Sequence, residues 1–308
     1  MHVDNFLGNI FVSCDRGCNF RLSIERIYMQ DFVHLHVHTQ YSLLDGQASV
    51  SRLVDKAMKD GMKGIAVTDH GNMFGIKEFT NYVNKKNSGP KGEIKDLKKR
   101  IAGIESGEIE CEDKEAEIAD CRAKMAEAES KLFKPIVGCE MYVARRTMDK
   151  KEGKPDQSGY HLIVLAKNEK GYHNLIKLVS HAWTRGYYMR PRTDRSELEK
   201  YHEGLIVCSA CIGGEVPKKI INDQLEEAEE AVRWYKNLFG DDFYLELQRH
   251  KATVPRANHE TYKLQEVVNQ KLVEYSKKYN IKLVCTNDVH FVDEENAEAH
   301  DRLICLST

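Results

Sequence analysis

The sequence predicts an α/β protein whose mainly parallel sheet of seven strands closes, or nearly closes, into a TIM-like barrel. Seven short runs rich in apolar and β-branched residues appear after residue 31. Most of these runs are separated by stretches with helical periodicity, and such strand–helix alternation is typical of βα units. The runs are nearly continuous in apolar residues, as expected for strands that are covered on both faces.

The predicted elements follow one another in a regular order. The seven runs are FVHLHVH (32–38), KGIAVTDH (63–70), KPIVGCEMYV (134–143), YHLIVLAKN (160–168), GLIVCSAC (204–211), FYLELQRH (243–250) and IKLVCTNDVHFV (281–292). The clearest helical stretches between them are SVSRLVDKAMKDGM (49–62), GYHNLIKLVSHAW (171–183), QLEEAEEAVRWYKNLF (224–239) and HETYKLQEVVNQKLVEYSKKYN (259–280).

One segment, at about residues 87–134, interrupts this order and is rich in Lys and Glu. Its apolar residues form two narrow seams with spacings of three and four, which are typical of paired helices. The seams are Ile94, Leu97, Ile101 and Ile104, then Ile118, Cys121, Met125, Ala128 and Leu132. With SGEIECEDKE as the turn, we expect a charged helical hairpin inserted into the barrel domain. The pattern leaves open whether it is a solvated structural insertion or an arm that docks a partner.

Length, charge and cysteine content limit the possible classes of protein. A chain of 308 residues allows one large domain or two ordinary ones. The net charge of −2 provides no global attraction to nucleic acid or to an anionic membrane, so such contacts need a local patch or bound cations. Nine scattered cysteines favour reduced thiols in a cytoplasmic protein. No apolar run reaches the roughly 18 residues of a transmembrane helix.

The first 30 residues differ from the rest of the chain. They show no periodicity that continues into the barrel, and we predict an extension that is disordered or foreign to the native protein. Met29 stands directly before the first strand-like run and is the expected natural start. The barrel domain is then expected over residues 31–308.

Residues that commonly bind metals lie at or near the ends of six of the seven runs. They are His36, His38, Asp45, His70, Glu140, His161, Cys211, Asp288 and His290. In a parallel barrel the carboxyl ends of the strands meet on one face, where sites are built. Nine donors are too many for one ion and suit two or three divalent cations. Imidazoles and a thiolate favour zinc, whereas the carboxylates also admit manganese or iron.

The first run carries three histidines at alternate positions. Strand geometry predicts that His34, His36 and His38 share one face. An H-x-H pair can chelate one ion, so we assign His36 and His38 to a metal. His34 comes two residues earlier, and we expect it to pack or to support the site.

Several of the other donors have a simpler explanation when taken singly. Asp45 stands beside a glycine and would suit a turn. Asp69, next to His70, would suit a supporting contact or a helix cap. His161 could be a buried, hydrogen-bonded histidine, and Cys211 belongs to a C-x-x-C that could be a redox pair. The coincidence of donors at so many strand ends favours a multinuclear metal site instead.

A basic and aromatic stretch, TRGYYMRPRTD, lies between the fourth and fifth runs. Arginines bind phosphates and tyrosines stack on bases. We therefore take Arg190, Arg192 and Tyr188 as candidates for substrate binding, with Arg185 and Tyr187 beside them. The alternative, a surface loop that happens to be basic, stays open.

Several motifs together resemble a known family. HLHVHTQYSLLDG, GIAVTDHGNMFG, GCEMYV, YHLIVLAKNEKGYHNLIKLVS, RPRTD, CIGGEV and TNDVHFV are similar to the N-terminal polymerase-and-histidinol-phosphatase (PHP) domain of the bacterial replicative DNA polymerase III alpha subunit. The resemblance runs from about residue 31 to the end of the chain, apart from the charged hairpin. It implies a distorted seven-stranded βα barrel.

The resemblance also implies a site for up to three metal ions. The implied ligand sets are His36, His38, Glu140 and Asp288 for one ion, Glu140, His161 and Cys211 for a second, and Asp45, His70 and His290 for a third. The first set is implied to carry catalysis through its bound metal. All nine positions hold residues able to bind a metal, which implies an active 3′–5′ exonuclease that proofreads the primer 3′ end.

The implied partners are DNA, the rest of the polymerase alpha subunit, and replisome subunits such as a sliding clamp or a separate exonuclease; no membrane is implied. The family's polymerase aspartates lie in a downstream domain, and this chain contains no D-x-D constellation. Two alternatives remain for the barrel. It could be a metal-stabilised structural module that braces the polymerase or docks a proofreading subunit, or a histidinol-phosphatase-like phosphoesterase.

Overall fold

The structure, a computed structural model, describes residues 32–43, 45–251 and 260–306. The predicted extension over residues 1–30 lies outside the described residues. The strands are β1 (Gly64–Val67), β2 (Lys134–Ala144), β3 (Gly159–Ala166), β4 (Arg192–Thr193), β5 (Leu205–Cys208), β6 (Phe243–Leu247) and β7 (Lys282–Cys285). The helices are α2 (Val50–Lys59), α3 (Ile76–Lys86), α4 (Ser88–Ser106), α5 (Lys114–Ser130), α6 (Gly153–Asp156), α7 (Glu169–Thr184), α8 (Arg195–Tyr201), α9 (Glu215–Ile221), α10 (Leu225–Phe239), α11 (Glu260–Tyr279) and α12 (Ala297–Ile304), with short 3₁₀ turns η2 (Gly240–Asp242) and η3 (Glu294–Asn296).

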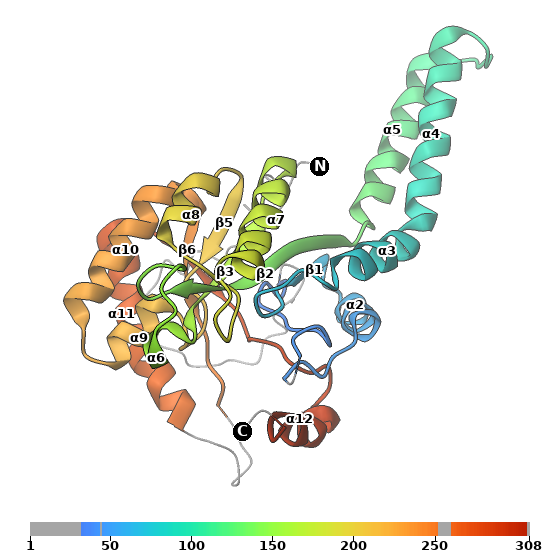
Figure 1. The fold of residues 1–308 in the computed structure, drawn as a ribbon. Coiled ribbons are helices and arrows are strands. Elements are labelled where there is room, and N and C mark those ends of the chain that lie inside the picture. Colours follow the sequence, from blue (N-terminus) through green and yellow to red (C-terminus); the bar gives the residue numbers. More distant parts are fainter. Residues whose placement is uncertain (1–31, 44, 252–259, 307–308) are drawn as a thin grey trace, which may run out of the picture.

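The strands form a curled sheet of seven strands with helices around it, which confirms the predicted fold class (Figure 1). The strand order is β1-β2-β3-β5-β6-β7, and β4 pairs with β2. Four pairings are parallel, but β3 runs antiparallel to both β2 and β5. The expectation of a mainly parallel sheet therefore did not foresee the reversed direction of β3. Among the described helices, none combines the length and apolar character that a bilayer crossing requires.

The first predicted run, residues 32–38, is not a regular strand but joins the two edges of the curled sheet. On one side its carbonyls accept hydrogen bonds from Ala66 and Thr68, around β1. On the other side Val37 forms an isolated parallel bridge with Val289, in the segment that follows β7. This segment therefore completes the barrel at the end where the strands terminate.

Apolar side chains fill the interior of the barrel below that end. One buried cluster takes residues from the first run and from β1, β2, β3, β5, β6 and β7. The side chains that point outward pack against helices: α7, α9, α10 and α11 cover one part of the sheet, while α2 and α3 cover the part around β1. Gly138 of β2 lies where the interior is narrow, because a Cβ there would come within 2.6 Å of the Leu165 side chain.

Helices α4 and α5 form a hairpin that projects from the body of the molecule (Figure 1). The residues of the two predicted seams are all buried or half-buried. Gly107, with φ of 83°, ends α4, and Asp113 caps α5 by accepting a hydrogen bond from the Ala116 amide. At the base, the Asn87 side chain donates to the Phe133 carbonyl over 2.7 Å and accepts from its amide over 2.9 Å. The Asn87 side chain thus ties the two ends of the hairpin together at its base.

Candidate metal centre

The interior-facing side chains change from apolar to polar at one end of the barrel. Residues two apart on a strand face the same side. On β2 this series runs from buried, apolar Ile136 to Glu140, and along β7 and its continuation it runs from Val284 to Asp288. The same alternation in both strands places a layer of candidate metal ligands directly above the apolar interior.

The reversed direction of β3 explains why its donor lies at its start. Because β3 is antiparallel to its neighbours, its first residues lie at the edge where the other strands end. His161, opposite Tyr142 in the register, thereby reaches the site, and its Nδ1 lies 2.9 Å from Oε1 of Glu140. The sequence predicted His161 as a donor but did not indicate the strand direction that brings it to the site.

One close group has four donors: His36, His38, Glu140 and Asp288. Nε2 of His36 lies 3.0 Å from Glu140 Oε2, 3.0 Å from Asp288 Oδ1 and 3.1 Å from Nε2 of His38. Asp288 Oδ1 is also 3.2 Å from His38 Nε2. Two Zn–N bonds of about 2.0–2.1 Å at a tetrahedral angle separate their nitrogens by about 3.3 Å. The spacing of these atoms is therefore close to that of ligands around one ion.

The orientation of Asp288 supports the same conclusion. Its Oδ1 atom is buried and has no partner with hydrogen-bond geometry, although two imidazole nitrogens are near it. Such an arrangement is expected when the lone pairs of the carboxylate oxygen and of the two imidazole nitrogens all point at one central position instead of forming hydrogen bonds with one another. Asp288 also has a positive φ of 48°, a left-handed conformation that is uncommon for residues other than glycine. Backbone strain of this kind is often found at functional sites.

The two carboxylates of this group, Glu140 and Asp288, stay ionised although burial opposes their charge. Burial raises the pKa of Glu140, but the charge of His161 and other histidines outweighs it and holds that pKa well below its usual range. The pKa of Asp288 is likewise held well below its usual range, because His36 outweighs burial. Burial lowers the pKa of His38 to about 3, so this ring is a neutral donor. For His36 burial is outweighed by neighbouring carboxylates, and its pKa is raised.

Glu140 connects this group to a second one. Its Oε2 atom faces His36, while its Oε1 lies 2.5 Å from Nδ1 of His70 and 2.9 Å from Nδ1 of His161. The second group of close donors is therefore His70, Glu140 and His161. A carboxylate with one oxygen turned to each group is suited to bridge two cations.

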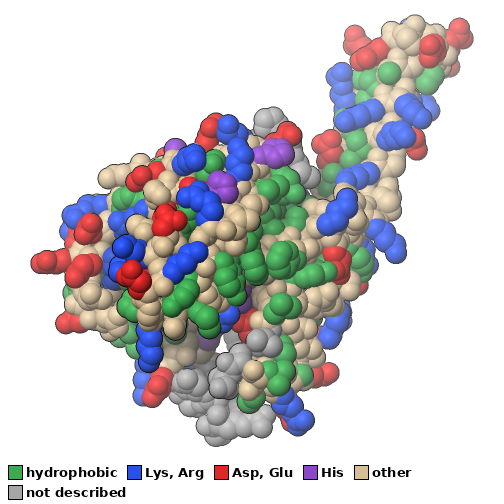
Figure 2. Space-filling model, viewed as in Figure 1, with side chains coloured by type: hydrophobic (Ala, Val, Ile, Leu, Met, Phe, Trp, Pro, Cys, Tyr) green, Lys and Arg blue, Asp and Glu red, His purple; other side chains and the backbone are tan. Residues whose placement is uncertain are grey.

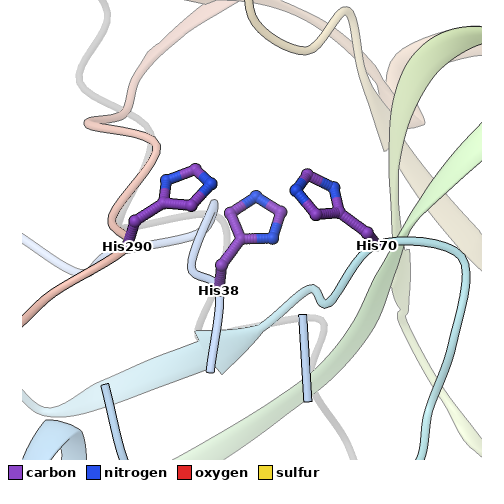
Figure 3. Close-up of side chains that lie close together, drawn as sticks. All are labelled: His38, His70 and His290. Atoms are coloured by element: carbon purple, nitrogen blue, oxygen red, sulfur yellow. The ribbon is translucent and has the colours of Figure 1, made fainter. Parts of the chain in front are cut away.

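The third group is formed by three histidines, His38, His70 and His290, whose rings point toward one another (Figure 3). The ring centroids of His38 and His70 are 4.0 Å apart, and those of His38 and His290 are 4.3 Å apart. Asp45 contacts the same group, with Oδ2 2.8 Å from Nε2 of His70. Burial raises the pKa of Asp45, but its hydrogen bond with His70 leaves the net pKa lowered. This carboxylate is charged and available.

Cys211 lies at the margin of the cluster. Its Sγ is 3.7 Å from Nδ1 of His161, and it belongs to none of the three close groups found among the described residues. Burial raises the pKa of the Cys211 thiol. The preceding residue, Ala210, has a φ of 63° and is buried, so the loop that carries the thiol is held in an unusual conformation.

Glu246 is an important contact that the sequence reasoning missed. It lies on the interior face of β6, is 2% exposed, and its Oε1 is 2.7 Å from Nδ1 of His36. This contact fixes Nδ1 as the protonated nitrogen and leaves Nε2 directed at the other donors. The Gln248 amide and the Thr286 hydroxyl both donate to the same Glu246 oxygen. A glutamate in the middle of the apolar run FYLEL was the signal that could have revealed it.

Asp69 supports the cluster without joining it. It accepts hydrogen bonds from the Thr39 amide over 2.7 Å and from the Ser42 hydroxyl over 2.8 Å. Ser42 Oγ in turn lies 3.0 Å from Nδ1 of His38 and accepts a bond from the His70 amide. Asp69 thus orients two histidines through one hydroxyl.

The expectation that three histidines share one face is wrong for His34. The amides of Ala66 and Thr68, two residues apart, bond to the carbonyls of His34 and Val37, three residues apart. The extra residue is a bulge, and it reverses the alternation between His34 and His36. The His34 ring packs against Phe32 instead, and burial lowers its pKa to about 4.

The structure also corrects the proposed role of Arg192. This arginine is fully buried in β4, where its guanidinium donates to the carbonyls of Gly186 over 3.0 Å and Met148 over 2.8 Å. It therefore holds the loop in place and is not accessible to a phosphate. Arg190 is exposed and Tyr188 is half-buried, so these two candidates stay at the surface of the same loop.

Comparisons with known proteins agree with the resemblance in the sequence. The PHP domain family matches residues 34–250, and the chain belongs to this family. Among curated proteins, the DNA polymerase III subunit alpha of Borreliella burgdorferi is 41% identical over 90% of this chain. That of Aquifex aeolicus is 36% identical, also over 90% of this chain.

The matched region is a small part of these relatives. It covers 19% of the Borreliella protein and 20% of the Aquifex protein, so the chain spans about a fifth of their length. Among solved structures, a putative metal-dependent phosphoesterase from Bifidobacterium adolescentis aligns over 88% of this chain and 96% of its own, with 14% identity and a TM-score of 0.38.

Proposed function

We propose that this chain is the PHP domain of a DNA polymerase III alpha subunit and a metal-dependent 3′–5′ exonuclease that removes mismatched nucleotides from primer ends. The observation that carries the proposal is the convergence of His36, His38, Glu140 and Asp288 within one layer, with Glu140 turned toward a second group of donors. The names of its relatives supply the replication context.

Two or three bound divalent cations would lower the pKa of water and neutralise the charge of a phosphodiester. Imidazoles dominate the donor set, so zinc is favoured, and manganese or iron also suits the carboxylates. The chain's own residues hold the arrangement. Glu246 fixes the tautomer of His36, and Asp69 orients the His38 loop through Ser42. His290 and Asp45 border the site, with side chains 18% and 32% exposed. They mark the side from which a phosphate group can approach.

The proposed setting is a replisome in the cytoplasm. The substrate is the primer 3′ end, and the partners are the rest of the polymerase chain and replisome subunits such as a sliding clamp or a separate exonuclease. The relatives are about five times longer than the matched region, which is consistent with a domain that acts beside a polymerase.

To test this, the chain is loaded with zinc or manganese and incubated with a primer–template duplex that has one 3′-terminal mismatch. We expect stepwise loss of 3′ nucleotides, prevented by chelation. His36→Ala and Asp288→Ala should each lower the rate by at least about 100-fold, because losing even a residue that supports a ligand costs about 10- to 100-fold. His34→Ala is the matched control, since this histidine lies outside the site, and it should retain the rate.

A second function, a metal-stabilised structural module, is favoured by one observation. Glu140 is 1% exposed, and a buried carboxylate is costly unless cations or hydrogen bonds compensate it. The two functions differ in the mismatch assay. If fully metal-loaded chain binds the duplex and releases no nucleotide, the structural role stands and the exonuclease does not.

A further inference from the structure

An exposed group of large apolar side chains lies beside the candidate metal centre. Phe74 is 58% exposed, Trp183 39%, Tyr187 48% and Met189 62%. Figure 2 shows hydrophobic side chains gathered over the face that α7 occupies. Monomeric proteins seldom expose several such residues together unless the surface binds something.

The three aromatic rings are arranged in a row. The Trp183 and Tyr187 rings are stacked, with centroids 5.7 Å apart and an angle of 22° between their planes. Phe74 lies on the Trp183 ring, with centroids 5.6 Å apart and an angle of 43°. We call Phe74, Trp183 and Tyr187 the aromatic row. Faces and edges of partly exposed rings are the surfaces on which unpaired bases stack.

The aromatic row is joined directly to the backbone of the metal-binding residues. The Trp183 indole donates a hydrogen bond to the Gly71 carbonyl over 2.8 Å, and the Gly71 amide donates to the Glu140 carbonyl over 2.7 Å. His70 is the residue immediately before Gly71. Trp183 therefore contacts the residue next to the candidate ligand His70. Through Gly71 it is also linked by two hydrogen bonds to the backbone of Glu140.

The loops that carry the aromatic row are held in place. Gly71 has a φ of 62°, and a Cβ there would come within 2.6 Å of Pro191 and 3.2 Å of Tyr142. Asn72 fixes the same loop by donating to the Tyr41 carbonyl over 3.0 Å. Such rigid rings lose little conformational freedom when they bind a ligand.

The loop of Tyr187 is fixed from below by the buried arginine described above. Arg192 binds the carbonyl of Gly186, the residue before Tyr187. The Tyr188 amide donates to the Arg190 carbonyl over 3.1 Å, and Met189 between them has a φ of 63°. This tight turn holds Tyr187 and Arg190 at the surface.

Positive charge lies next to the aromatic row. Arg190 is exposed and has no ion-pair partner among the described residues. Arg190 directly precedes Pro191, which packs against Gly71 together with the Tyr142 ring. The Tyr142 ring lies 5.2 Å from the His161 ring in the metal centre. A cation on the loop beside both the rings and the metal centre is placed to hold a phosphate.

We propose that Phe74, Trp183 and Tyr187 form a stacking platform that binds unpaired bases of a single-stranded DNA end and leads its phosphates past Arg190 to the metal centre. Rings, an exposed arginine and a phosphoester site then lie side by side, where one frayed strand can contact all three. This inference rests on the proposed nuclease function and adds the selectivity for unpaired over paired ends, because only unpaired bases expose their faces.

Tryptophan fluorescence provides a direct test, since the chain has two tryptophans, Trp183 and Trp234. In a Trp234→Phe background, Trp183 is the single reporter. The probe is an oligothymidylate of about ten nucleotides with phosphorothioate linkages, a length within the range that single-strand sites cover. Stacking is expected to quench the signal, and a duplex of the same length should quench it far less.

Substitutions then test each ring in the same background. Tyr187→Ala and Phe74→Ala are each expected to weaken binding roughly 5- to 100-fold. Val267→Ala on α11, also an exposed apolar residue at 53%, is the matched control and should not change binding. Unchanged affinity in both aromatic variants would overturn the proposal. So would a wild-type dimer that Phe74→Ala converts to a monomer, because the row would then be a self-association surface.

A baseless phosphodiester separates this inference from the proposed function. Hydrolysis of bis(p-nitrophenyl) phosphate should be unchanged in Tyr187→Ala and Phe74→Ala, while their hydrolysis of single-stranded DNA falls. Absence of hydrolysis of any phosphodiester by metal-loaded wild-type chain contradicts the nuclease function, yet the quenching experiment still tests the platform.

Discussion

The layer of candidate metal ligands and the α4–α5 hairpin are both rich in charged residues, but the charges of the first are buried and those of the second are exposed. In the layer, Glu140 is 1% and His36 0% exposed, and the partners come from segments far apart in the chain. In the hairpin, ion pairs such as Lys124–Asp120 and Lys131–Glu127 are local and more than half exposed. Exposed pairs of this kind contribute about 0–1 kcal/mol each.

The difference teaches which part of the molecule depends on a ligand. Burying carboxylates costs folding free energy, even when histidines lie beside them. A cation that binds only the folded chain would offset that cost. The hairpin needs no such compensation, because its charges stay in water and its seam packs locally. Stability should therefore respond to metal at the barrel end and be nearly indifferent to the hairpin.

Metal removal is expected to have the largest effect. At a free metal concentration of about 1,000 times Kd, binding to the folded state contributes about 4 kcal/mol. For a chain of this size that is about 6 °C in melting temperature. Differential scanning calorimetry of chelated and metal-loaded chain measures it, with elemental analysis to confirm metal content. An unchanged melting curve after confirmed metal loss would contradict the conclusion that the stability of the barrel end depends on bound metal.

Substitution of the supporting glutamate should have the next largest effect. Glu246→Gln keeps the size of the side chain but removes the charge that holds Nδ1 of His36 protonated. We expect metal affinity to fall about 10- to 100-fold. Competition with a chelating dye measures the affinity. His34→Gln is the control from the same segment, and an equal loss in both variants would mean that the effect is not specific to the site.

Metal affinity should also depend on pH. In the metal-free chain, burial lowers the pKa of His70, but Glu140 and Asp45 outweigh it and the pKa rises to about 10. The proton on His70 must leave before its nitrogen can bind a cation. Raising the pH from 6.5 to 8.5 should therefore strengthen binding by about tenfold per unit for each proton released. His38 releases none, because its pKa is lowered to about 3.

Calorimetric titration in buffers of different ionisation enthalpy counts the released protons directly. The expected count at pH 7.5 is at least one per chain, from His70. Affinity that stays constant over this range, with no proton release, would show that the histidines are already deprotonated.

The sequence predicted the fold class and the nine candidate donors because both depend on local signals. Alternating strand-like and helical runs define an α/β sheet, and polar residues at strand ends are visible in the printed sequence. The hairpin seams were visible for the same reason. These features need no knowledge of which segments lie side by side.

The features that sequence reasoning did not foresee depend on pairing. The direction of β3 follows from where β2 and β5 lie, and the bulge between His34 and Val37 follows from the register with β1. The sequence alone suggests that Arg192 is a surface residue of a basic loop. The structure shows instead that it is buried and donates to two backbone carbonyls. Local patterns contain no information on such long-range contacts.

Removal of the hairpin should have the smallest effect and gives the sharpest comparison with the metal centre. Residues 89–131 can be replaced by a short Gly/Ser linker, because Asn87 already joins the two ends through Phe133. We expect metal affinity within about twofold of the intact chain, and little loss of stability, since loop length adds only about 0.6 kcal/mol per doubling. The same excision with Asn87→Ala should unfold at lower temperature, because two buried backbone groups lose their partner at about 1–3 kcal/mol each. If excision alone abolished metal binding, the hairpin would have to be part of the site, and the separation between the two regions would fail.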